Sequence, residues 1–184
     1  MTTAVSAPAK IILFGEHAVI HGQPAIAVPV STLRATAIVH NGGDGLRIRS
    51  VDLDQVLPVS LETDLVDSAL ALTARLVLQR LDASPPDALI TLESTIPMAS
   101  GLGSGAAVSA ALARAVAAAV GYDLPQTELN AIVFEIEKTY HGTPSGIDNT
   151  VIVYEQPVYF VRGCDIEILP IPRPVTLIVA DTGT

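Results

Sequence analysis

Short runs of apolar residues, separated by turn-forming residues, make up most of the first half of the chain. Runs of about four to eight apolar or alternating residues bounded by Gly, Pro or Asn are typical of strands. The strands expected on this basis cover residues 10–14, 24–29, 33–40, 46–51 and 88–93. The sequence Asn-Gly-Gly-Asp-Gly at 41–45 is a strong turn signal. We therefore predict that 33–40 and 46–51 pair as a hairpin.

Longer segments in the rest of the chain have the apolar spacing of helices. The predicted helices cover residues 64–81, 104–120 and 125–140. The turn-rich segment 141–149 is expected to be a loop that enters another helix or strand. Short apolar runs at 151–154, 157–161 and 175–180 are predicted as strands. Because the last run stops close to residue 184, we expect the chain to be the N-terminal part of a longer enzyme.

Composition and charge narrow the class of protein. The 184 residues, 49% of them hydrophobic, suffice for one α/β or α+β domain with its own core. The net charge is −9 and the ten basic residues are scattered, whereas nucleic-acid binding usually needs a basic patch. No stretch reaches the ~18 apolar residues of a membrane span, and the start lacks the layout of a signal peptide. Cys164 is the only cysteine. We expect a cytoplasmic enzyme without a nucleic-acid or membrane partner.

The segment at 97–107, with the sequence PMASGLGSGAA, carries the clearest chemical signal. Its glycines, Gly101, Gly103 and Gly105, allow positive φ and a close backbone approach to a ligand. The predicted helix that follows offers unpaired N–H groups and the positive end of its dipole. A loop that leads into a helix in this way favours binding of phosphate.

Other polar residues supply the remaining parts of a phosphoryl-transfer site. Such a site needs a phosphate cradle, oxygen ligands for Mg²⁺, a cation and a group that positions the attacking hydroxyl. The backbone at 101–106 is the candidate cradle, and Ser104 and Glu137 are candidate Mg²⁺ ligands. Lys10 is the candidate cation. Asp148, expected in a polar loop, could accept a proton or orient an alcohol.

Each of these residues also has an ordinary structural interpretation. The glycines could form only a tight turn, Lys10 could be a solvated charge, Glu137 a surface residue and Asp148 a helix cap. The histidines show no metal-ligand spacing on one element. What favours the functional interpretation is that all the parts occur in one chain.

Two other nucleotide-binding motifs fit the glycine loop less well. Residues 101–106 match G-x-G-x-x-A, and Asp123 lies about where a ribose-binding acid could fall. However, the preceding strand is expected to end near Glu93, whereas a dinucleotide fold places the first glycine at the strand end. A Walker loop is excluded because the sequence contains no Gly-Lys-Ser/Thr.

Three segments together resemble the mevalonate kinase family of the GHMP kinase superfamily. They are PAKIILFGEHAVIHGQPAIA, PMASGLGSGAAVSAA and EKTYHGTPSGIDN. The glycine loop alone indicates the superfamily, while GEHAVIHG and the aspartate of HGTPSGIDN are more specific. The resemblance implies an α+β, ribosomal protein S5 domain 2-like fold, in which a mixed sheet is packed with helices. It also implies that 1–184 is the N-terminal, ATP-binding domain, without its C-terminal domain.

The resemblance further implies ATP-dependent phosphorylation of the primary hydroxyl of mevalonate, with Mg²⁺ as cofactor and a possible homodimer. Asp148 matches the catalytic aspartate, Lys10 the lysine beside the hydroxyl, and Glu137 the acidic Mg²⁺ ligand. The implied substrate residues are Glu16, His17 and Ser145. The implied nucleotide-binding residues are Pro97, Ser100, Gly101, Leu102, Gly103, Ser104, Gly105 and Ala106.

Two departures from the family pattern matter. The family has a second serine, a Mg²⁺ ligand, where this chain has Gly105, so Ser104 or water would have to replace that hydroxyl. The family's third motif, a second glycine-rich loop, is absent from these residues, so we expect little or no turnover from 1–184 alone. Two alternatives remain open: a GHMP kinase for another small alcohol, and a nucleotide-binding module without catalysis.

Overall fold

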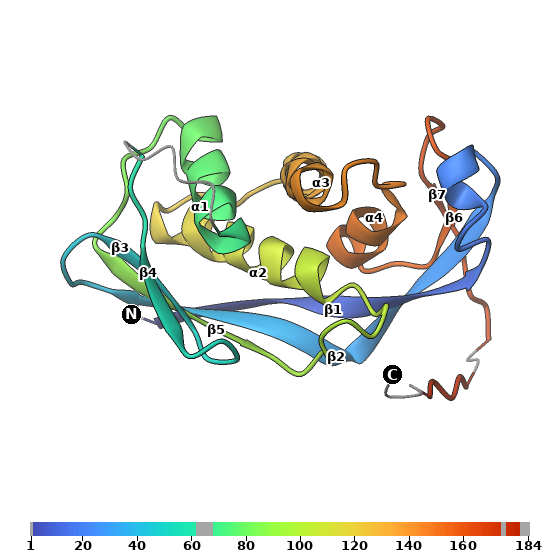
Figure 1. The fold of residues 1–184 in the computed structure, drawn as a ribbon, viewed down its shortest axis with the longest axis horizontal. Coiled ribbons are helices and arrows are strands. Elements are labelled where there is room, and N and C mark those ends of the chain that lie inside the picture. The colour runs from blue at the N-terminus through green and yellow to red at the C-terminus, as the bar shows by residue number, and fades with distance from the viewer. Residues whose placement is uncertain (1, 62–67, 174–175, 181–184) are drawn as a thin grey trace.

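Four helices cover one face of a mixed β-sheet (Figure 1). The computed structural model describes residues 2–61, 68–173 and 176–180. The strands are β1 (Thr2–Phe14), β2 (Ala25–Asn41), β3 (Leu46–Ser50), β4 (Gln55–Pro58), β5 (Ala88–Ser94), β6 (Val158–Phe160) and β7 (Glu167–Ile168). The helices are α1 (Ala69–Arg80), α2 (Ser104–Ala119), α3 (Gln126–His141) and α4 (Ile147–Tyr154), with a short 3-10 helix at Val19–His21.

The strand order shows that the predicted hairpin is wrong. The order is β4-β3-β5-β2-β6-β7, and β1 pairs with β2 outside this path. β5 therefore lies between β2 and β3, antiparallel to β2 and parallel to β3. The turn after β2 reverses the chain, as predicted, but it leaves room for a strand that arrives later through α1. Ile90 of β5 is fully buried there, which favours a central position in the sheet.

The two longest strands were predicted only in pieces. The predicted strands 24–29 and 33–40 are parts of the single strand β2, and the register with β1 shifts between Pro8 and Ala9. Pro8 pairs with Arg34 but Ala9 pairs with Val30, so residues 31–33 bulge out of the ladder. β1 starts at Thr2 rather than at residue 10, and its most buried part is 7–10, not 11–14.

Other differences concern short elements. Residues 151–154, predicted as a strand, lie in α4, because periodicity cannot tell a short buried strand from a buried helix. β4 and β7 were not predicted, and 176–180 form no strand, while Val175 lies outside the described residues.

The first helix begins at Ala69, where Ser68 Oγ accepts the Leu70 N–H at 3.3 Å. The predicted residues 64–67 of that helix lie outside the described part.

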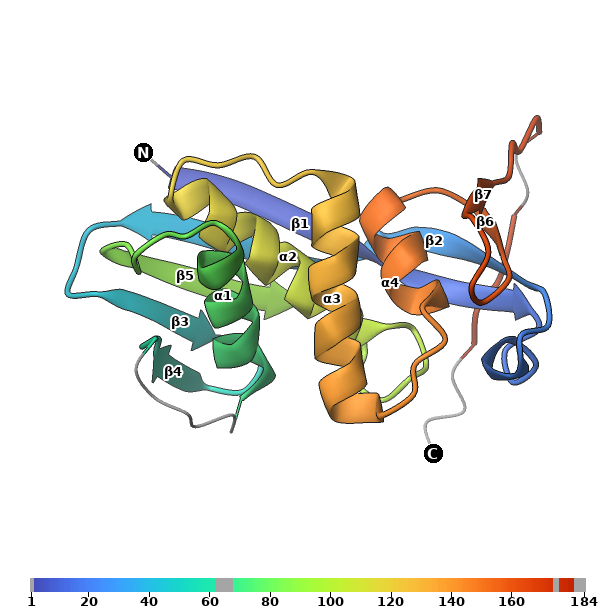
Figure 2. The same cartoon turned by 90° about the horizontal axis from the view of Figure 1, so that it is seen from above.

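The alanine-rich helix α2 lies between the sheet and the other helices. It contacts β1, β2 and β5 on one side and α1, α3 and α4 on the other. Seen from above, α3 lies between α1 and α4 (Figure 2). Ala107, Ala110 and Ala111 are fully buried, and their small side chains allow this close approach. The helix is thereby fixed with its start beside Lys10 of β1.

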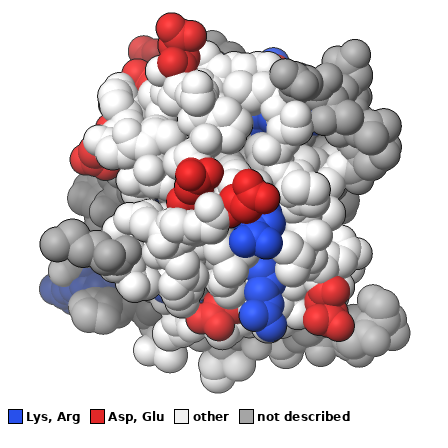
Figure 3. Space-filling model, turned by 90° about the vertical axis from the view of Figure 1, so that its left-hand side faces the viewer, with Lys and Arg blue, Asp and Glu red and all other residues white. Residues whose placement is uncertain are grey.

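Charged side chains of both signs lie next to one another on the face shown in Figure 3, where a short row of basic residues borders acidic ones. None of the helices in the described part of the chain is both long enough and apolar enough to cross a membrane.

Candidate active site

The glycine-rich segment forms a loop that leads directly into α2. Gly101 and Gly103 have φ values of +74° and +75°, a region that favours glycine. Gly103 caps the helix, and its carbonyl accepts the Ala107 N–H at 3.0 Å. The N–H groups at 104–106 belong to the first turn and have no intrahelical acceptor. They form a cradle for an anion at the positive end of the helix dipole.

The loop is attached to the sheet at Lys10. The Lys10 N–H donates to the Leu102 carbonyl at 3.0 Å. The Leu102 side chain lies in the hydrophobic core, so of this residue only the backbone is near the site. The loop and the strand that carries Lys10 are therefore held together by a backbone hydrogen bond.

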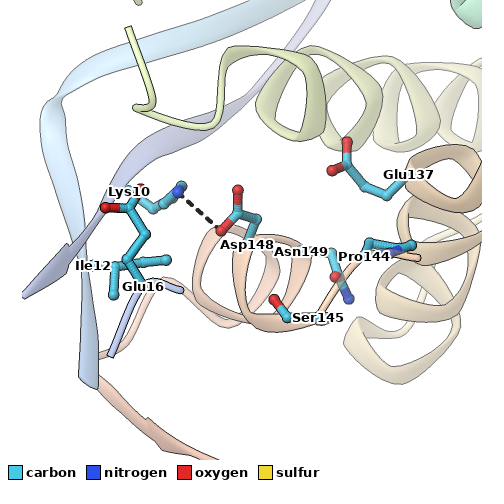
Figure 4. Close-up of a pocket in the computed structure, with 9 residues that line it drawn as sticks. Lys10, Ile12, Glu16, Glu137, Pro144, Ser145, Asp148 and Asn149 are labelled. Carbon is cyan, nitrogen blue, oxygen red and sulfur yellow. Dashed lines mark ion pairs between the residues drawn. The ribbon is translucent and has the colours of Figure 1, made fainter. Parts of the chain in front are cut away.

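Lys10 and Asp148 form an ion pair at the centre of the site (Figure 4). Lys10 Nζ lies 2.9 Å from Asp148 Oδ1, and the two side chains are 5% and 32% exposed. The prediction that Asp148 lies in a loop is wrong, because Asp148 belongs to the first turn of α4. A carboxylate in the first turn of a helix is favoured by the helix dipole. The buried ammonium group holds the partly exposed carboxylate in one orientation, with solvent access left on one side.

Two adjoining cavities meet at this ion pair. One, of about 430 Å³, is lined by the glycine loop and the start of α2. The other, of about 240 Å³, is lined by Ile12 and by 144–146 before α4. Both cavities share Lys10, Glu16, Glu137 and Asp148. A phosphate group in the first cavity would thus lie next to a small molecule in the second.

Glu137 reaches from α3 toward the start of α2 (Figure 4). A Cβ placed on Gly105 would lie 3.9 Å from Glu137 Oε1. Ser104 lines the same cavity. Carboxylate and hydroxyl oxygens suit Mg²⁺, which usually keeps water and phosphate oxygens as its other ligands. Within residues 2–61, 68–173 and 176–180, no three His, Cys, Asp or Glu side chains form a group that could hold a metal. The carboxylate of Glu137 and the hydroxyl of Ser104 fit Mg²⁺ that is bound together with a phosphate.

The other predicted site residues differ in which cavity they line. Glu16 is exposed and lines both cavities, whereas His17 is exposed and lines neither. Ser145 lines the smaller cavity, and its Oγ accepts the Ile147 N–H at 3.3 Å. Ser100 lines the loop cavity, and its Oγ donates to the Pro97 carbonyl at 2.8 Å. Pro97 lines neither of these cavities but a mostly apolar one that also contains Ser104.

Sequence reasoning missed several residues that line the site. Gly146 has a φ of +93°, and a Cβ there would lie 3.3 Å from the Phe160 ring, so another residue would be strained at this approach to α4. Asn149 donates from Nδ2 to Asn130 Oδ1 at 2.7 Å and is 3% exposed. Ile12 carries no polar signal, but Gly146 and Asn149 belong to the turn-rich motif that pointed to Asp148.

Comparison with known proteins identifies the domain. Residues 66–156 match the family described as GHMP kinases N terminal domain. The chain carries a GHMP kinase N-terminal domain. A curated mevalonate kinase of Thermococcus sibiricus is 32% identical over 200 residues, which cover 100% of this chain and 58% of that protein. The chain thus spans little more than half the length of the curated relatives that it matches.

Solved structures show the same fold. The mevalonate kinase of Methanococcus jannaschii has a TM-score of 0.83 at 24% identity, over 92% of this chain and 56% of its own. A Streptococcus pneumoniae phosphomevalonate kinase in complex with phosphomevalonate and AMPPNP has a TM-score of 0.74 at 20% identity, over 87% of this chain and 50% of its own. The α+β fold of a GHMP kinase N-terminal domain, which the resemblance implied, is confirmed.

Proposed function

We propose that this GHMP kinase domain binds Mg·ATP and takes part in phosphorylating the primary hydroxyl of mevalonate. The products are 5-phosphomevalonate and ADP. The observation that carries the proposal is the meeting of a phosphate cradle and a small polar cavity at the Lys10–Asp148 pair. Turnover needs a second half of the kind that the relatives possess. Below, "the complete enzyme" means the chain together with such a half.

The proposed chemistry assigns one task to each part of the site. The N–H groups at 104–106 hold phosphate oxygens of ATP. Asp148 orients the attacking hydroxyl and accepts its proton as the oxygen bonds to the γ-phosphorus. The bond from the γ-phosphorus to the bridging oxygen breaks, and ADP leaves with the electron pair. Lys10 offsets the negative charge of the transferred phosphoryl group next to Asp148. Glu137 and Ser104 would hold Mg²⁺, which neutralises charge on the transferred phosphoryl group.

A mostly apolar cavity supports the assignment of a nucleotide. It has a volume of about 340 Å³ and lies against the glycine loop, with Ser104 shared between it and the phosphate cavity. Apolar residues such as Leu53, Ile96 and Met98 line it. A base in this cavity and phosphates in the loop would be joined across the start of α2. The S. pneumoniae neighbour has the same fold and its complex holds AMPPNP, which supports a nucleotide as ligand.

A binding titration of the 184-residue chain tests the nucleotide assignment. We expect saturable binding of Mg·ATP by calorimetry and weaker binding of ATP with EDTA, because Mg²⁺ is usually held by one or two carboxylates together with phosphate oxygens. Absence of Mg·ATP binding, or equal binding with and without Mg²⁺, would contradict the assignment.

Replacing Gly105 with Ser is expected to tighten Mg·ATP binding by about tenfold, at the lower end of what changes around a metal site cause. The residue lies in a regular helical turn, and a Cβ there meets nothing closer than Glu137 Oε1 at 3.9 Å. The new hydroxyl would therefore face the Mg²⁺ site without a clash. Gly105→Ala, which adds the Cβ without the hydroxyl, is the matched control. Unchanged or weaker affinity of Gly105→Ser would mean that Ser104 or water already completes the site.

The carboxylate of the proposed substrate needs a cation other than Lys10. Glu16, Glu137 and Asp148 make the smaller cavity acidic. The cavity next to it, of about 450 Å³, shares Ser145, Gly146 and Asn149 with it and contains Arg162. Arg162 is exposed and donates to the Ile20 carbonyl at 3.3 Å, so its remaining N–H groups can meet a carboxylate.

In the complete enzyme, Arg162→Ala is expected to raise KM for mevalonate by about 10- to 100-fold, the range for a lost charged hydrogen bond. KM for ATP should stay the same, because Arg162 lines neither the loop cavity nor the apolar cavity beside it. Steady-state kinetics with each substrate varied provide the check. Arg80→Ala, an exposed arginine at the end of α1, is the control. Equal effects of both variants on KM for mevalonate would remove this role from Arg162.

A further inference from the structure

Gly103 packs against the side chain of Lys10. A Cβ placed on Gly103 would lie 2.9 Å from Lys10 Cγ and 3.2 Å from Lys10 Cε. It would also lie 2.9 Å from Cδ1 of Ile152. Carbon atoms do not approach one another so closely without strain, since their optimal separation is about 3.5–4.0 Å. The absent Cβ therefore leaves the space that the aliphatic part of Lys10 occupies.

The contact joins three elements that carry the site. Gly103 begins α2 through its hydrogen bond with Ala107, and the preceding Leu102 carbonyl is bound to the backbone of Lys10. Ile152 lies on α4 one turn after Asp148, and it is fully buried. The stem of Lys10 thus lies beside Gly103 and close to Ile152, while its Nζ meets Asp148 at 2.9 Å.

We propose that Gly103 is a positioning residue that fixes the Lys10 side chain and thereby couples the phosphate loop to the Lys10–Asp148 pair. A displacement of the loop at Gly103 moves the stem of Lys10, because β1, the loop and α4 are packed without a gap at this point. The geometric part of the proposal stands on these contacts. Its consequence for phosphoryl transfer rests on the proposed function.

The loop provides a matched control for this idea. Gly101 has nearly the same φ as Gly103, at +74° against +75°, but a Cβ on Gly101 would meet nothing within 4 Å. Alanine at either position bears the same cost of a positive φ. Only at Gly103 does the new methyl group displace Lys10 and Ile152. A comparison of the two substitutions separates backbone strain from displacement of the lysine.

Amine labelling of the 184-residue chain can follow Lys10 directly, because Lys10 and Lys138 are its only lysines. Reductive methylation, read by peptide mass spectrometry, should label buried Lys10 slowly and exposed Lys138 fast. We expect Gly103→Ala to label Lys10 about fivefold faster, the factor that a modest local destabilisation gives. Gly101→Ala should leave Lys10 as slow as in the unchanged chain, and Lys138 should be equal in all variants. Equal Lys10 rates in the two alanine variants would overturn the proposal.

A second variant tests the contact from the other side. Ile152→Val removes Cδ1, one of the two atoms at 2.9 Å, so in the Gly103→Ala background it should slow Lys10 labelling again. If Gly103→Ala does not fold, Ile152→Val alone carries the test: Lys10 should label faster, because loss of Cδ1 loosens the packing around Gly103, where the Lys10 stem lies. Val153→Ala, a buried change on the same helix, should not have this effect. Equal labelling in Ile152→Val and Val153→Ala would contradict the proposal.

These measurements are made without nucleotide, so they remain separate from the proposed function. Should the unchanged chain fail to bind Mg·ATP while Gly103→Ala still exposes Lys10, the proposed function fails and the positioning role stands. Should Mg·ATP bind while Gly103→Ala and Gly101→Ala label Lys10 alike, the positioning role fails and the proposed function stands.

Discussion

Replacing Asp148 with Asn should lower kcat of the complete enzyme by about 10²- to 10⁴-fold, the usual contribution of a positioned general base. Asn keeps the size of the side chain but cannot accept the proton of the attacking hydroxyl. It also removes the charge that Lys10 meets at 2.9 Å. KM for ATP should change little, because the phosphate cradle is made by backbone groups at 104–106. Steady-state kinetics with mevalonate and ATP provide the measurement.

Asp123→Asn is the control for this substitution. Asp123 is an exposed acid in the segment between α2 and α3, and it lines neither cavity of the site. It should leave kcat unchanged. A normal kcat in Asp148→Asn would remove Asp148 from the proposed mechanism, whatever the control shows.

The second large effect is expected for Lys10→Met, which should lower kcat by about 10²- to 10³-fold, the usual effect of removing one charge-stabilising group from an active site. Met fills the space beside Gly103 with an aliphatic chain of similar length, so the packing at the loop is kept. What is lost is the ammonium group next to Asp148 and the transferred phosphoryl group. A comparison of kcat at saturating ATP and mevalonate measures the loss.

Lys138→Met provides the matched control. Lys138 is exposed, pairs with the exposed Glu135 at 2.8 Å and lies over the ring of the half-buried Phe134, all on α3. The Lys138→Met variant should have a normal kcat. Both Lys10→Met and Lys138→Met should show the circular dichroism spectrum of the unchanged protein. If Lys10→Met turned over normally, the electrostatic role of Lys10 would be wrong even if Asp148 proved essential.

The features that the sequence predicted best depend on local signals. The start of α2 at Ser104 follows from glycines that favour positive φ and from the alanines after them. The candidate site residues Lys10, Glu16, Glu137 and Asp148 were chosen by chemistry and by resemblance, and they line two cavities that share them. The start of α2 rests on residue types whose backbone preferences hardly depend on distant parts of the chain, whereas the roles of the four site residues stay predictions.

The features that were missed depend on distant partners. The position of β5 between β2 and β3 is set by burial of side chains from paired residues that are 42 to 59 positions apart in the sequence. The helical state of 151–154 is fixed by packing, because Val151, Ile152 and Val153 are fully buried between other elements. For the same reason, the approach of Gly103 to Lys10 could not be predicted. The glycine signalled a turn, but not which side chain occupies the space it leaves.

The most direct test of the account is ATP-dependent ADP release by the complete enzyme with four alcohols, namely mevalonate, phosphomevalonate, galactose and homoserine. The account predicts rapid ADP release with mevalonate alone, with one phosphate transferred for each ADP formed and the rate lost in Asp148→Asn. Rapid release with another of these alcohols would assign the site to a different GHMP kinase substrate. Absence of ADP release with any of them, in an enzyme that binds Mg·ATP, would contradict the claim that this site transfers phosphate to a small alcohol.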